Sequence, residues 1–214
     1  KIRARSFSLR SERNVLPGCP SVVTVSYRNL TALSLRIVRD PAGDDPATPD
    51  GGRRFFSSDA TEEAKRLLAQ PVVRQWTVEL SPTPDYRTRE QRIELPALDA
   101  GHYALLVSSR ADFLPGASAL YFALLQVSEL TMVSRSRLGG LEGLLLRAAG
   151  GEPVTGAEVT LYQPHYSERT LTRLATTRTD AEGCFTLPRG ADSQEWLLIA
   201  RAPGGSRLVE THRG

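Results

Sequence analysis

Histidine carries much of the metal and acid–base chemistry that proteins perform near neutral pH, and this 214-residue chain contains three histidines. His102 precedes Tyr103 in a strand-like run, His165 lies in a Pro-His-Tyr stretch, and His212 lies near the end. The chain has no HExxH, CxxC or GxSxG pattern, and no spacing places two histidines on one metal. Without a nucleophile and base at a usable spacing, structural or solvated roles are favoured. The sequence therefore predicts no catalytic, cofactor-binding or metal-binding residue, and a chain that is not an enzyme.

A cluster of acids offers oxygen ligands that could hold calcium: Asp40, Asp44, Asp45 and Asp50. Their spacing misses the alternating positions and the terminal glutamate of an EF-hand. Three prolines interrupt the same stretch, namely Pro41, Pro46 and Pro49. Large apolar side chains are almost absent from it. A solvated loop over residues 40–54 is therefore favoured over an ion site.

Four aromatic residues could either pack in a core or lie at a surface that contacts another molecule or domain. Phe55 and Phe56 follow two arginines, and core packing is favoured for them over a cap on a sandwich edge or a contact with another domain. Trp76 and Trp196 lie in strand-like runs, and core positions are favoured for both. Exposed tryptophans would instead indicate a platform for sugars.

Two cysteines, Cys19 and Cys184, lie 165 positions apart in different candidate domains. Two cysteines cannot form a framework of disulfides. Two buried free thiols are favoured over one bridge between domains, because free cysteine behaves as a small hydrophobe.

The composition is that of an ordinary folded protein, with 40% hydrophobic and 24% charged residues. No stretch reaches the roughly 18 unbroken apolar residues of a membrane-spanning helix. The net charge of +3 arises almost entirely from arginine and forms no basic stripe, so the sequence gives no support to a nucleic-acid partner. A length of 214 residues suits two small domains.

Short β-branched and apolar runs separated by Gly, Pro, Asn and Asp predict an all-β fold. Residues 21–27 show the clearest alternation, with Val23, Val25 and Tyr27 on one face of a strand. Seven runs would build a first sandwich: 5–9, 21–27, 33–38, 73–80, 92–95, 102–108 and 119–127. Seven more would build a second: 130–134, 141–146, 157–162, 171–177, 184–187, 195–202 and 207–211.

One helix is expected over residues 60–70, capped by Ser58 or Asp59 and stopped by Pro71. With the acidic loop before it, this helix forms an expected insertion of the first sandwich at about 40–70, because so few residues cannot bury a core alone. The domain break is expected between Val127 and Leu141. The predicted domains are therefore residues 1–130 and 131–214.

Several local patterns resemble known families. Residues 151–162 (GEPVTGAEVTLY) and 179–188 (TDAEGCFTLP) resemble prealbumin-like and carboxypeptidase-regulatory-like sandwiches. Residues 21–30, 95–107 and 126–130, taken in this order, resemble the macroglobulin domains of bacterial alpha-2-macroglobulin-like proteins. The resemblance covers roughly residues 6–207. It implies two consecutive antiparallel β-sandwiches of the macroglobulin, fibronectin III-like or prealbumin-like kind.

The macroglobulin resemblance also implies a function, that of a scaffold fragment in a large protease-trapping protein of the periplasm or cell envelope. Its partners would be other domains of the same parent chain and, through the full-length protein, client proteases. The family's Cys-Gly-Glu-Gln thioester signature is absent, because Cys19 precedes Pro20 and Cys184 precedes Phe185. An alternative class remains open, in which the chain is an adhesin-like or carbohydrate-binding pair of sandwiches from a surface protein.

Overall fold

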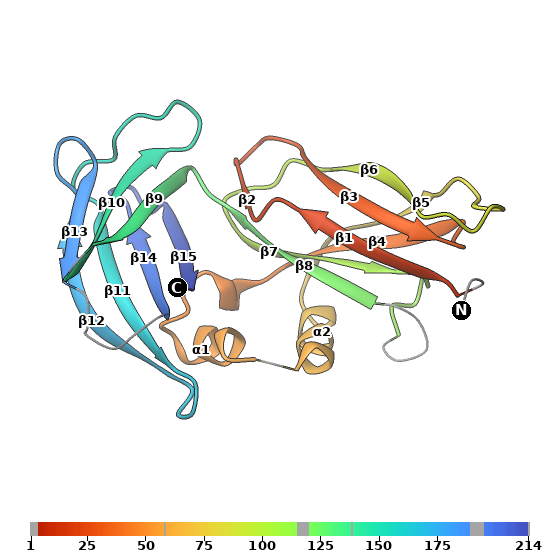
Figure 1. Cartoon of the computed structure of the whole chain (residues 1–214), viewed down its shortest axis with the longest axis horizontal. Coiled ribbons are helices and arrows are strands. Elements are labelled where there is room, and N and C mark those ends of the chain that lie inside the picture. The colour runs from red at the N-terminus through yellow and green to blue at the C-terminus, as the bar shows by residue number, and fades with distance from the viewer. Residues whose placement is uncertain (1–3, 58, 115–119, 138, 189–194, 214) are drawn as a thin grey trace. The chain divides into compact units, whose positions relative to one another are not determined.

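The computed structural model describes residues 4–57, 59–114, 120–137, 139–188 and 195–213. The chain forms two compact units, each built from two β-sheets (Figure 1). The first unit, here called the first sandwich, comprises Lys1–Pro41 and Ser57–Val127. The second unit, the second sandwich, comprises Ala42–Phe56 and Ser128–Gly214. The expected all-β class is confirmed, and no helix in the described ranges is both long and apolar enough to cross a membrane.

The first sandwich pairs a three-stranded sheet, in the order β1-β3-β6, with a five-stranded sheet, in the order β2-β8-β7-β4-β5. Its neighbouring strands are antiparallel except for the short parallel pair of β2 with β8. All seven predicted strands are present, and the two-residue β2 is an addition. The strands are β1 (Ser6–Ser11), β2 (Asn14–Val15), β3 (Ser21–Arg28), β4 (Ala32–Arg39), β5 (Val72–Glu79), β6 (Arg89–Leu95), β7 (Gly101–Ser108) and β8 (Leu120–Val127).

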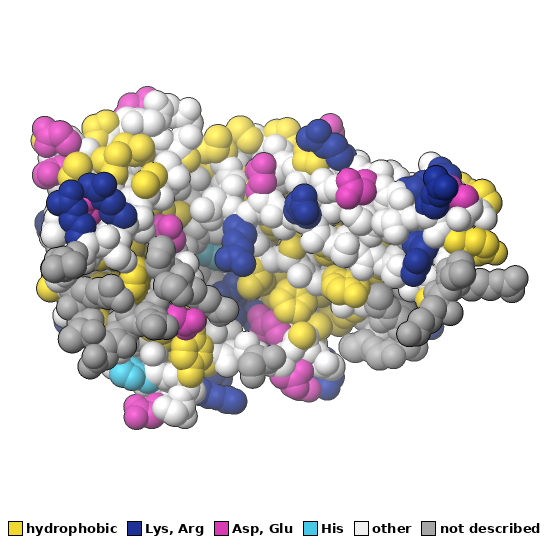
Figure 2. Space-filling view, viewed as in Figure 1, with side chains coloured by type: hydrophobic (Ala, Val, Ile, Leu, Met, Phe, Trp, Pro, Cys, Tyr) yellow, Lys and Arg dark blue, Asp and Glu magenta, His cyan; other side chains and the backbone are white. Residues whose placement is uncertain are grey.

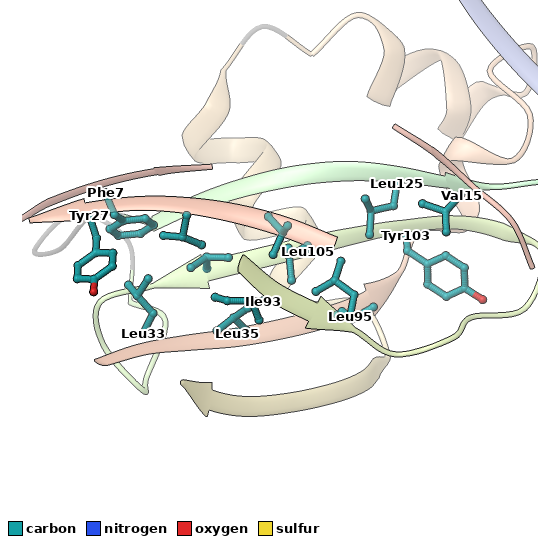
Figure 3. Close-up of a cluster of buried hydrophobic side chains, with 14 of the residues drawn as sticks. Phe7, Val15, Tyr27, Leu33, Leu35, Ile93, Leu95, Tyr103, Leu105 and Leu125 are labelled. Atoms are coloured by element: carbon teal, nitrogen blue, oxygen red, sulfur yellow. The ribbon is translucent and has the colours of Figure 1, made fainter. Parts of the chain in front are cut away.

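The core of the first sandwich follows from the alternation of its strands. In β3, Val23, Val25 and Tyr27 are buried while the residues between them are partly exposed, as the sequence predicted. These side chains pack with those of the facing sheet, among them Leu35 and Leu105 (Figure 3). Burial of apolar surface between the two sheets is therefore the main stabilising contribution here.

The outer face of the five-stranded sheet is apolar as well, and the expected helix covers it. Helix α2 (Ala60–Leu68) begins at Asp59, whose carboxylate accepts hydrogen bonds from the amides of the first turn. Leu67 of α2 packs with Ala104 and Leu106 of β7 and with Phe113. Strand β7 is buried on both faces for this reason, which explains its unbroken apolar run.

The second sandwich pairs a three-stranded sheet, in the order β13-β10-β9, with a four-stranded sheet, in the order β12-β11-β14-β15. All seven predicted strands are confirmed. Its core lies between the sheets and includes Leu145, Val159, Phe185, Trp196 and Leu198. The strands are β9 (Leu130–Arg137), β10 (Gly140–Arg147), β11 (Glu158–His165), β12 (Thr170–Arg178), β13 (Cys184–Pro188), β14 (Glu195–Arg201) and β15 (Arg207–Arg213).

The prediction of an exposed loop over residues 40–54 is wrong in part. Asp40, Gly43, Pro46 and Gly51 are buried, and the stretch contains a 3-10 turn, η1 (Pro41–Gly43), and a short helix, α1 (Pro49–Phe55). Thr48 caps α1 by accepting a hydrogen bond from the Gly51 amide. Proline at the first helical position suits a helix start, a signal that the loop interpretation did not use.

The segment Ala42–Phe56, here called the strap segment, belongs to the second sandwich although residues of the first sandwich flank it on both sides. The expected insertion at 40–70 is thus divided, since α2 stays with the first sandwich. The chain passes between the two units three times, at Pro41, at Phe56 and at Val127. Independent folding of 1–130 and 131–214 remains a prediction.

Candidate functional site

The three histidines occupy unrelated places. His102 in β7 is 8% exposed, and its Nε2 lies 2.7 Å from Oε1 of Gln126 in β8. Gln126 in turn donates from Nε2 to Oδ1 of Asn14 at 3.1 Å. His165 ends β11 half-buried, and His212 lies in β15 opposite Trp196. His102 is thus part of a polar chain across three neighbouring strands, which suits a structural role.

Three acids of the 40–54 stretch are engaged by arginines, namely Asp40, Asp45 and Asp50. Asp40 is fully buried, and Nη1 of Arg66 donates to its Oδ1 at 2.8 Å. The same guanidinium donates to both carboxylate oxygens of Glu63, at 2.9 and 2.7 Å. Asp50 is bonded by Arg53 on the surface of α1. No group of three or more His, Cys, Asp or Glu side chains within the described ranges could hold a metal ion.

The Arg66 cluster fastens α2 to the end of β4. The hydrogen bond that Arg66 donates to Glu63 raises the pKa of Arg66 most strongly, burial opposes this, and Asp40 raises it further. Arg66 therefore carries its charge at neutral pH. Its fork of donors satisfies both carboxylates, which is the condition under which a buried charge such as Asp40 is tolerated.

A second arginine cluster holds the strap segment on the second sandwich. Arg201, at the end of β14, donates from Nη2 to Oδ2 of Asp45 at 2.9 Å. Arg207, at the start of β15, donates to the same oxygen at 3.4 Å. Burial acts to lower the pKa of Arg201, but its hydrogen bond and charge interaction with Asp45 outweigh burial and raise that pKa. The two arginines lie opposite one another in the β14–β15 register, so the sheet itself creates this cation pair.

Apolar contacts of the strap segment accompany this ion pair. Phe55 packs against a cluster made by Tyr162, Leu197 and Ile199 on the outer face of the four-stranded sheet. Phe56 is 7% exposed and meets the ring of Tyr166 edge to face, with the centroids 5.5 Å apart. The two phenylalanines therefore cover the outer face of the second sandwich. This placement agrees better with the contact to another domain, weighed as an alternative, than with the favoured core packing in the first sandwich.

Sequence reasoning missed this docking, although a signal was present. The run from Trp196 to Ala200 is apolar without interruption, and all five residues are buried. In an antiparallel sheet with one face in water, alternate residues of such a strand would be polar. The unbroken run therefore indicates that something covers the outer face of this strand.

The cysteine prediction was wrong about burial and right about bonding. Cys19 and Cys184 are both exposed, and both are free thiols, as favoured over a bridge between domains. Cys19 lies in a turn beside Gly18, and Cys184 begins β13 on the side of the strand that faces away from the core. Both thiols therefore lie outside the cores of their sandwiches.

Trp196 is 3% exposed in the core of the second sandwich, as favoured from the sequence. Trp76 is half-buried in β5, where it packs on the first core and lies beneath the guanidinium of Arg74. On the face seen in Figure 2, arginines form separate groups with acids beside several of them. Neither tryptophan presents an open face of the kind that stacks on sugars.

The ionised carboxylate of Glu210, in β15, destabilises the folded second sandwich. Its Oε2 is buried without a hydrogen-bond partner among the described residues, and burial raises its pKa. A raised pKa means that the folded state disfavours the ionised form. The contribution of Glu210 to stability therefore falls as pH rises from about 4.3, the value of a free glutamate, through its folded pKa.

We expect Glu210→Gln to raise the unfolding temperature of the second sandwich at pH 7, because the amide carries no charge to bury. The gain should shrink toward pH 4, where Glu210 is mostly protonated in both states. Thermal unfolding of the two proteins at both pH values checks this. Glu168→Gln, at an exposed carboxylate in the β11–β12 turn, is the matched control. A gain of equal size at pH 4 and pH 7 would show that ionisation is not its cause.

Comparison with known proteins shows which fold this is. No protein-family model matches the chain, and no curated protein matches its sequence. Among solved structures, the chain is similar to native Escherichia coli alpha-2-macroglobulin spanning domains MG0-NIE-MG1, with a TM-score of 0.64 and 18% identity. The match covers 95% of this chain and 63% of that structure.

A second structure of the same Escherichia coli protein spans domains NIE-MG1 and matches with a TM-score of 0.61 and 18% identity. The match covers 96% of both chains. The fold of the chain is thus similar to that of the NIE-MG1 domains of Escherichia coli alpha-2-macroglobulin. The resemblance expected from the sequence is thereby confirmed for the fold.

Proposed function

We propose that this chain is a non-catalytic scaffold part of a bacterial alpha-2-macroglobulin-like protease-trapping protein. The observation that carries the proposal is the fold similarity to the NIE-MG1 pair, which covers 96% of both chains and therefore includes both sandwiches. A single β-sandwich fold serves many functions, but two in the same succession restrict the choice. The corresponding location is the periplasm or cell envelope.

The chemistry of the described residues supports a scaffold role. Two arginine-centred clusters each fasten one element to another: Arg66 with Asp40 and Glu63, and Arg201 with Asp45. The carboxylates of these two clusters are engaged in ion pairs, so they position backbone elements and are not poised for proton transfer. The partners would be other domains of the parent chain, with client proteases engaged through the full-length protein.

The alternative of a carbohydrate-binding or adhesin-like pair is less well supported. Stacking on sugars requires an exposed aromatic face. Trp196 is buried in the core, and Trp76 packs on the first core with Arg74 over its ring. These positions favour the scaffold over the adhesin.

The purified chain should neither hydrolyse substrates nor inhibit a protease. We expect no turnover in screens of peptide, ester and phosphoester substrates. We also expect trypsin to cleave casein at its normal rate in the presence of excess chain, since neither cysteine has the thioester signature around it. Turnover that is lost on His102→Ala or His165→Ala, with folding retained, would contradict the scaffold assignment.

The decisive test of the proposed function uses the gene that encodes this chain. We expect its remaining open reading frame to encode further macroglobulin-like sandwiches. The expressed parent should trap trypsin, so that trypsin still cleaves a small chromogenic peptide but no longer cleaves a large protein. A wall anchor or a stack of near-identical repeats in the same reading frame, with no effect on trypsin, would support the adhesin instead.

A further inference from the structure

The strap segment, Ala42–Phe56, is a discrete piece of structure. Asp45 accepts at Oδ1 from the Ala47 amide at 3.1 Å, and its carbonyl accepts from the amide and the hydroxyl of Thr48 at 3.1 and 2.8 Å. Thr48 then caps α1, and the Gly52 amide donates back to the Thr48 carbonyl at 2.7 Å. These bonds are all internal to the segment, so lifting the segment from the sheet breaks none of them directly. A helix of seven residues is marginal in water without a surface to pack on, so its amides open to solvent once the segment is lifted.

An ion pair and two aromatic rings contribute to holding the strap segment on the sheet. One carboxylate, Asp45, meets Arg201 and Arg207, and two rings, Phe55 and Phe56, meet the apolar cluster and Tyr166. Phe55 is only half-buried. No strand of the sheet pairs with the segment, because β14 is already paired with β11 and β15. Removal of the segment therefore breaks no backbone ladder.

The ion pair at Asp45 is open to solvent on one side. The side chains of Asp45, Arg201 and Arg207 are 19%, 27% and 44% exposed. Dissolved salt screens charges in such a position, with a Debye length of about 10 Å at 0.1 M and about 3 Å at 1 M. The attraction that fixes the segment is thus adjustable by ionic strength, whereas the sandwich core beneath it is not.

We propose that the strap segment is a releasable cover, which lifts from the second sandwich as one unit while both sheets stay folded, and whose release is governed by the ion pairs of Asp45. Local openings of this kind occur where buried contacts are few and the backbone ladder is not involved. Lifting uncovers the outer face of the four-stranded sheet at Leu197 and Ile199, which are fully buried when it is closed. The inference concerns this chain alone and does not depend on the proposed function.

Hydrogen exchange of the whole chain, read by mass spectrometry, tests the release. We expect the Gly52 and Phe56 amides, which donate within α1, to exchange at least about tenfold faster than the paired amides of β14. Raising the salt from about 0.02 M to about 1 M should speed exchange in 48–56 several-fold and leave β14 unchanged. Exchange of 48–56 at the rate of β14, at both salt concentrations, would overturn the proposal.

Two variants connect the release to Asp45. Asp45→Asn keeps the size of the side chain but removes its charge, so exchange in 48–56 should be fast already at low salt and should respond little to added salt. Asp112→Asn is the matched control, because Asp112 pairs with Arg110 on the first sandwich. An Asp45→Asn protein whose segment exchanges like wild type and keeps the full salt response would overturn the role of Asp45.

Discussion

Replacing Gly183 by alanine should unfold the second sandwich at a temperature about 10–20 °C lower than wild type, which corresponds to a loss of about 2–4 kcal/mol. Gly183 closes the turn from Asp180 to β13 with a φ of +76°, a conformation that costs residues with a Cβ about 1–2 kcal/mol. A Cβ there would also lie 2.6 Å from the carbonyl oxygen of Leu145. That carbonyl belongs to β10, and the Leu145 amide donates to the Gly183 carbonyl at 2.9 Å, so neither side can retreat without losing a bond.

Gly151→Ala is the matched control for this substitution. Gly151 has nearly the same φ, +78°, but a Cβ there would meet nothing within 4 Å. Its cost should therefore be the conformational part alone, about 1–2 kcal/mol. Thermal unfolding of both variants separates strain from collision. Equal losses would show that the Leu145 carbonyl moves aside at little cost.

Replacing the strap segment by a Gly/Ser linker of equal length should destabilise the second sandwich and leave the first unchanged. The linker leaves Tyr162, Leu197 and Ile199 without Phe55, and it removes the buried ring of Phe56. At about 25 cal/mol per Å² of apolar area, the expected loss is about 2–4 kcal/mol. Thermal unfolding should show a lowered transition for the second sandwich, together with increased binding of a dye that reports exposed apolar surface.

Arg53→Ala is the control for the linker variant, because Arg53 lies on the exposed side of α1 and contacts only Asp50 among its ion pairs. It should unfold like wild type. If the linker variant instead lost stability in the first sandwich, the strap segment would be part of that core, and the division of the chain into these two units would be wrong.

The strands were predictable because their signals are local. The alternation of apolar and polar residues over 21–27 indicates both the strand conformation and the face that is buried. In the structure this strand pairs with β1 on one side and β6 on the other. Asp59 and the acids after it likewise identify the start of α2. Each of these signals is contained within about ten residues.

The docking of the strap segment was not predictable in the same way. Asp45 looked like one acid among several in a loop, and nothing near it in the sequence identifies Arg201 as its partner. The exposure of Cys19 and Cys184 was missed for a related reason, since the general preference of cysteine for the interior gives no information about a particular strand end. A local sequence pattern does not identify which surface, formed by distant residues, a segment will cover.

The hydrogen bond between Asp45 and Arg201 joins residues 156 positions apart, and this separation has a consequence for biosynthesis. When the strap segment leaves the ribosome, β14 and β15 have not yet been translated, and at about 5–20 residues per second they follow roughly ten or more seconds later. During that interval Phe55 and Phe56 lack the side chains of β14 and β15 that surround them in the folded protein. The second sandwich consequently finishes assembly only after β15 has emerged, and a chaperone that binds exposed aromatic residues would find Phe55 and Phe56 uncovered until then.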